Sequence, residues 1–123
     1  MSLSIAIILG IVGAICFLGG INILLKGAGY FLPEGTPPQI VLDNVVRFLA
    51  GIYFGMSFLL AWATIHVNEI NELVYLLGIV VCFSGLGRLY SRIKMGPGGT
   101  YLFGVMCLEI ILGIALILLQ YFR

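Results

Sequence analysis

Four long apolar segments dominate this sequence and restrict how the chain can fold. They cover about residues 3–25, 37–66, 73–94 and 100–122, and a helix of roughly 20 residues crosses about 30 Å of hydrocarbon. Of the 123 residues, 62% are hydrophobic and only 9% are charged, whereas a soluble domain carries about 25% charged residues. The sequence therefore predicts an all-α fold: one integral membrane domain over residues 1–123, a four-helix transmembrane bundle with up-and-down topology and short loops.

Glycine, proline and capping residues indicate where these helices end. Gly27 follows the cationic Lys26 and suits a left-handed cap of the first helix. Thr36 precedes two prolines and lies three residues before Gln39, a pattern that predicts a capped start of the second helix at residue 37. Thr100 is expected to cap the fourth helix. The first apolar run lacks the basic start of a signal peptide, so we expect it to be a retained membrane helix.

Basic residues are distributed unevenly over the helix ends. They are Lys26 after the first helix, Arg92 and Lys94 at the end of the third, and Arg123 at the C-terminus. The hinge between the second and third helices carries only acids, so the positive-inside bias places loops 26–36 and 95–99 in the cytoplasm and both termini outside. A formal net charge of +1 provides no basic face for nucleic acid. Membrane lipids are thus expected partners, and nucleic acid is not.

Three ionisable residues, Arg47, Arg88 and Glu109, lie inside the apolar segments. A charge at the bilayer centre costs about 2.5–3.5 kcal/mol, so these side chains should avoid lipid. At a rise of about 1.5 Å per residue, all three fall in one layer of the membrane, which Asn22 of the first helix also reaches. We expect Glu109 to pair with Arg88 across the last helical hairpin, and Arg47, helped by Asp43 one turn earlier, to join them.

Several functions are compatible with such a cluster. In the first, its charges fix the helix register, and the protein is a non-enzymatic subunit or scaffold of a membrane assembly. In the second, the cluster binds a lipid or a small anion, because two arginines and one glutamate leave an excess positive charge. The ligand-binding residues would then be Arg47, Arg88, Glu109, Asp43 and Asn22. A proton or ion relay is a third function, but a carboxylate beside two arginines is a poor proton carrier.

Motifs for catalysis or metal binding are missing from the sequence. It has no Ser/His/Asp or Cys/His arrangement, no HExxH and no phosphate loop. Cys16, Cys82 and Cys107 lie in apolar segments without CxxC spacing, and His66 is typical of an interfacial polar side chain. We therefore expect no enzyme activity, no cofactor and no metal site. Glycines at helical spacing indicate close packing, and unused small-residue surface predicts a homo-oligomer or a larger membrane complex.

Several short motifs together resemble a known family. They are Asn44-x-x-Arg47, Gly51-Ile52-Tyr53-Phe54-Gly55, Trp62, Gly85-Leu86-Gly87-Arg88-Leu89-Tyr90-Ser91, Gly96-Pro97 and Leu108-Glu109. In this pattern the chain resembles, over nearly its whole length, the bacterial four-helix integral membrane family catalogued as domain of unknown function 4345. The resemblance implies a multi-pass protein of the bacterial inner (plasma) membrane with no assigned activity. It adds no catalytic residue and includes Arg47, Arg88 and Glu109.

Overall fold

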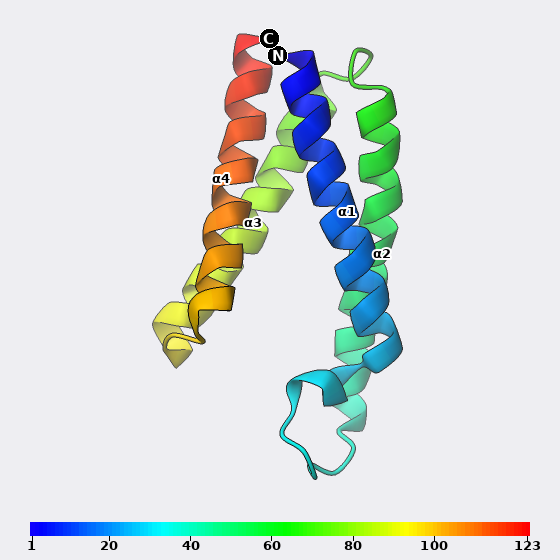
Figure 1. Cartoon of the computed structure of the whole chain (residues 1–123), viewed down its shortest axis with the longest axis vertical. Helices are drawn as coiled ribbons and strands as arrows, with labels where there is room; N and C mark the ends of the chain where they lie inside the picture. The colour runs from blue at the N-terminus through cyan, green and yellow to red at the C-terminus, as the bar shows by residue number, and fades with distance from the viewer. The chain divides into compact units, whose positions relative to one another are not determined.

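The computed structural model describes residues 1–123 and contains four α-helices and no strands. The elements are α1 (Ser2–Lys26), the short 3-10 helix η1 (Ala28–Phe31), α2 (Ile40–Ile65), α3 (Glu72–Met95) and α4 (Thr100–Phe122) (Figure 1). All four α-helices are long and apolar enough to cross a membrane. The expected all-α, four-helix class is confirmed, and the chain is a multi-pass membrane protein.

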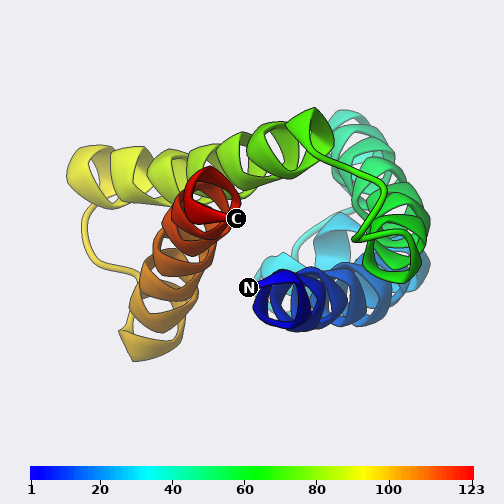
Figure 2. The same cartoon turned by 90° about the horizontal axis from the view of Figure 1, so that it is seen from above.

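The chain divides into two compact units. One comprises Leu9–Ile65, and the other comprises Met1–Ile8 with His66–Arg123. In the first unit, α1 and α2 run antiparallel and side by side (Figures 1 and 2). A Cβ atom added at Gly20 would lie 2.7 Å from the backbone nitrogen of Phe54. The missing side chain of Gly20 therefore lets the two helix backbones approach closely.

The second unit is built on the antiparallel hairpin of α3 and α4. A Cβ atom at Gly113 of α4 would lie 2.7 Å from the Cys82 nitrogen and 2.8 Å from the Gly78 carbonyl oxygen, both on α3. These distances locate the close contact between the two backbones. Figure 2 shows that the helices lie apart at their connecting turn, where Gly96 and Gly99 both have positive φ.

The predicted start of the second helix and the predicted cap of the fourth helix are wrong in detail. The second helix begins at Ile40, not at residue 37, and the Thr36 hydroxyl donates to the Pro33 carbonyl at 2.6 Å instead of capping that helix. The reason is the Pro37-Pro38 pair, because a residue that precedes proline is disfavoured in the helical region. At α4 the N-cap residue is Gly99, and Thr100 is the first helical residue.

Candidate functional site

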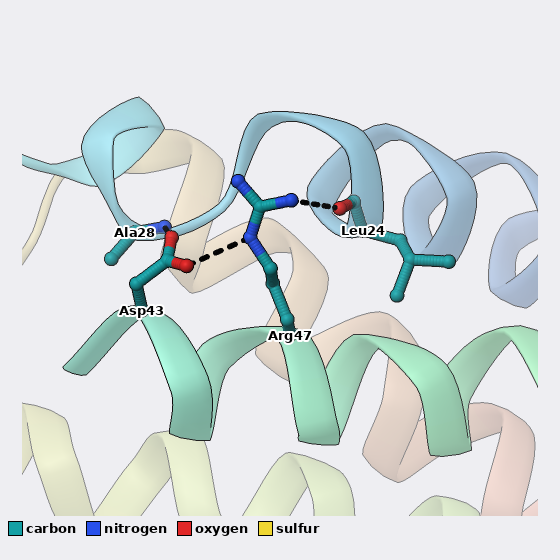
Figure 3. A network of polar contacts seen from close by, with 4 residues as sticks. All are labelled: Leu24, Ala28, Asp43 and Arg47. Carbon is teal, nitrogen blue, oxygen red and sulfur yellow. Dashed lines mark hydrogen bonds and ion pairs between the residues drawn. The ribbon is translucent and has the colours of Figure 1, made fainter. Parts of the chain in front are cut away.

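Four residues tie the end of α1 to the start of α2, and we call them the α1–α2 clasp: Leu24, Ala28, Asp43 and Arg47 (Figure 3). Arg47 Nε donates to Asp43 Oδ2 at 2.9 Å, and Arg47 Nη1 donates to the Leu24 carbonyl oxygen at 3.0 Å. The second carboxylate oxygen, Asp43 Oδ1, accepts a bond from the Ala28 backbone N–H at 2.9 Å. Asp43 and Arg47 share a face of α2 because they are four residues apart. Together they satisfy a carbonyl that the end of α1 leaves open.

Gly27 is the backbone position that makes the clasp possible. Its φ is +71°, a conformation that residues with a side chain rarely adopt. A Cβ atom at Gly27 would overlap the Asp43 carboxylate and would lie 2.6 Å from Arg47 Nη2. A glycine with positive φ therefore follows Lys26, but its ψ of −163° lies outside the left-handed helical region, so the expected left-handed cap is wrong. This conformation brings the α1 terminus against the two charged side chains.

We expect Gly27→Ala to lower the free energy of unfolding more than Gly35→Ala does. Gly35 also has positive φ, +83°, but a Cβ atom there meets nothing within 4 Å. Both variants strain the backbone, whereas only Gly27→Ala also displaces the clasp, which should add about 1–2 kcal/mol. Unfolding in SDS, followed by circular dichroism, measures both losses. Equal losses would contradict a structural role of the clasp.

A cavity of about 940 Å³ opens beside the clasp. Its wall includes two cations, Lys26 and Arg47, and two acids, Glu34 and Asp43. The formal charges of these four side chains cancel, since each sign occurs twice. Arg47 lines this cavity, and its Nη2 makes no hydrogen bond.

The second polar site lies on the α3–α4 hairpin, and we call it the α3–α4 ion pair. Arg88 Nε of α3 donates to Glu109 Oε1 of α4 at 2.5 Å, and the Ser84 hydroxyl donates to Glu109 Oε2. The side chain of Glu109 is 16% exposed and that of Arg88 is 41% exposed. Glu109 is thus the enclosed member and has both oxygens satisfied, which is what a carboxylate in an apolar layer requires.

The structure brings some of the predicted site residues together in pairs. Arg88 contacts Glu109, and Arg47 contacts Asp43, as expected. Asn22 is half-buried on α1 and makes no hydrogen bond to the clasp. The joining of Arg47 to the Arg88–Glu109 pair stays a prediction, because Arg47 belongs to a different unit of the chain.

One arginine has a role that the sequence reasoning missed. Arg123, at the end of α4, donates from Nη1 to the Val67 carbonyl oxygen at 2.7 Å and from Nη2 to the Ile70 carbonyl oxygen. These carbonyls belong to the hinge that precedes α3. The available signal was the topology itself, because an antiparallel hairpin returns the end of α4 to the start of α3.

A family model described as Domain of unknown function (DUF4345) matches residues 4–120 of the chain. The matched range contains both the α1–α2 clasp and the α3–α4 ion pair. No curated protein and no solved structure matches the chain. The family description assigns no activity.

Proposed function

Since the chain belongs to the DUF4345 family of unknown function, we propose a role from its own geometry: it is a small non-enzymatic subunit or scaffold of a membrane assembly. The membrane proposed is the bacterial inner membrane. In this role the intramembrane charges are structural and hold each helical hairpin in register. The uneven distribution of Lys and Arg supports cytoplasmic loops at 26–36 and 95–99, with both termini outside.

The main support is that each intramembrane arginine already has a carboxylate partner within its own hairpin. Arg47 uses Asp43 and a helix-end carbonyl, and Arg88 uses Glu109. Breaking such a pair leaves an uncompensated charge. Arg88 and Glu109 join two helices directly, whereas the Asp43–Arg47 pair lies on α2 and reaches the end of α1 through its bonds to Leu24 and Ala28. Both arrangements therefore favour one register of their hairpin. A catalytic group, in contrast, would need a reactive side chain that is not already committed to a structural bond.

Small residues that face outward support the assembly. A Cβ atom at Gly55, Gly87 or Gly104 would meet no atom within 4 Å. These glycines therefore do not serve packing within their own unit of the chain. In lipid, small residues let helices of two proteins approach closely, so the glycines are suitable contact points for another copy or another subunit.

The cavity beside the clasp favours a second candidate, a lipid- or small-anion-binding protein or carrier. Lys26 and Arg47 line a space of about 940 Å³, a volume within the range of ligand pockets. Arg47 would be the main ligand in this alternative. The balancing charges of Glu34 and Asp43 weaken its attraction for an anion.

Native mass spectrometry of the protein, extracted in patches of its own membrane, tests the assembly. We expect a mass above that of the 13.3 kDa chain, and we expect Gly55→Leu to reduce it because leucine fills the outward-facing gap. Leu49→Ile, an exposed position on α2 that keeps its bulk, is the matched control. A wild-type protein found only as a single chain would overturn the scaffold role. A bound anion that Arg47→Gln releases would favour the second candidate.

A further inference from the structure

A second cavity, of about 320 Å³, lies between α3 and α4 beside their connecting turn, and we call it the α3–α4 cleft. It exists because the two helices lie apart there (Figure 2). Its lining includes Arg88, Ser91 and Arg92 from α3, and Leu102, Phe103 and Met106 from α4. No acidic residue lines the cleft. It therefore combines two guanidinium groups with an apolar wall.

The charge of the cleft is positive after all ion pairs are counted. Arg88 is neutralised through its Nε by Glu109, which leaves the terminal nitrogens of Arg88 without a hydrogen bond. Arg92 has no carboxylate partner, and its guanidinium stacks on the Phe103 ring at 4.7 Å from the ring centre. Stacking holds the guanidinium plane in place while its edge donors stay available. Two arginines thus line one space that carries an excess positive charge, and the terminal nitrogens of both side chains make no hydrogen bond within the chain.

The start of α4 adds to this positive potential. Gly98 lines the cleft, and Gly99 is the N-cap residue, which has no side chain to cap the helix. The first backbone bond of α4 runs from the Phe103 N–H to the Gly99 carbonyl at 3.2 Å. The amides of residues 100–102 therefore have no partner inside the helix, and the helix dipole favours an anion next to them.

We propose that the α3–α4 cleft binds a phosphate group, the one carried by the headgroup of an anionic phospholipid. Arg92 lies about one turn from the end of α3, at the depth where a helix of this length meets the headgroups. Guanidinium donors match phosphate oxygens in geometry as well as charge. The apolar side chains of Leu102, Phe103 and Met106 offer the glycerol and acyl chains a surface that free phosphate does not use. The proposal does not depend on the scaffold role, because it uses Arg92 and the terminal nitrogens of Arg88, whereas the scaffold role uses the Nε of Arg88.

Two arms of one experiment distinguish the lipid from the free ion. In the first, the full chain is placed in nanodiscs of phosphatidylcholine with about one tenth phosphatidic acid, and lipid retention is measured by native mass spectrometry. In the second, inorganic phosphate is titrated into phosphatidylcholine nanodiscs and followed by calorimetry. The test variant is Arg92→Gln. Its matched control is Lys94→Gln, which removes the same charge from the same helix end but outside the cleft. Circular dichroism checks that both variants keep their helices.

We expect wild-type protein to retain phosphatidic acid over phosphatidylcholine, and Arg92→Gln to weaken that retention roughly fivefold more than Lys94→Gln does. Arg92→Lys should fall between wild type and Arg92→Gln, because it keeps the charge but not the forked donors. Heat in the phosphate arm, lost in Arg92→Gln, would extend the site to the free ion. Equal effects of the Gln variants at 92 and 94, or no preference for phosphatidic acid and no phosphate binding, would overturn the proposal.

Discussion

Replacing both Arg88 and Glu109 by leucine should cost less stability than the sum of the two single replacements. Each single change leaves a charge of the α3–α4 ion pair without its partner, which should cost about 1–3 kcal/mol in a partly exposed setting. The loss of stability should be larger for Arg88→Leu than for Glu109→Leu. In Glu109→Leu, Arg88 can extend from its 41% exposed position toward the headgroups, whereas in Arg88→Leu the 16% exposed Glu109 keeps only Ser84.

Unfolding in SDS, followed by circular dichroism for the four proteins of this cycle, gives the coupling energy, which we expect to be about 1 kcal/mol or more. The matched control is the cycle of Arg88→Leu with Asp43→Asn, two positions that belong to separate pairs. The same design with Arg47→Leu and Glu109→Leu tests whether Arg47 joins the cluster. Additive losses for Arg88 and Glu109 would show that the pair does not hold the hairpin.

Much of the fold follows from two simple properties of the sequence. The lengths of the apolar segments predict four spanning helices, since each one exceeds the thickness of the hydrocarbon. The cost of isolated charges in lipid selects Arg88 and Glu109 as partners. The spacing of four residues likewise puts Asp43 and Arg47 on one face of α2. These parts are predictable because each depends on a local pattern or on a single dominant energy term.

Other parts depend on where the backbone runs, which the pattern does not specify. The clasp partners Leu24 and Ala28 contribute a carbonyl and an N–H that every residue has. No side chain therefore marks them in the sequence. No side chain marks the hinge carbonyls that Arg123 contacts either, and only the hairpin topology indicates those bonds. The start of α2 could have been placed correctly, because the Pro37-Pro38 pair by itself disfavours a helix at residue 37.

The glycines of α3 and α4 also show what the sequence pattern does not specify. They are the same residue type in the sequence, but some lie at the contact between the helices and others do not. Gly78, Gly85 and Gly113 lie where α3 and α4 touch, whereas Gly87 and Gly104 of the same two helices meet no atom at a Cβ position. Composition alone predicts close packing for all of them. Which glycines allow the close packing depends on where the two helices cross.

Gly113→Ala should therefore destabilise the α3–α4 hairpin, whereas Gly104→Ala on the same helix should not. The new methyl at position 113 would lie 2.5 Å from Cys82 Sγ and 2.7 Å from the Cys82 nitrogen. Since the nitrogen belongs to the backbone, α3 and α4 have to move apart, and we expect a loss of about 2 kcal/mol. At position 104 the methyl enters open space, and alanine is the better helix former, so we expect no loss.

The same SDS unfolding measurement compares these two alanine variants. A further comparison is Gly113→Ala in a chain that also carries Cys82→Ala, which removes the Sγ contact but keeps the backbone contact. If the close approach of the backbones is what matters, this second change should recover only a small part of the loss, because the Cys82 nitrogen and the Gly78 carbonyl remain in the way. Full recovery would show that the sulfur alone had been displaced. Equal stability of the alanine variants at 113 and 104 would mean that the two helices do not depend on this contact to stay together.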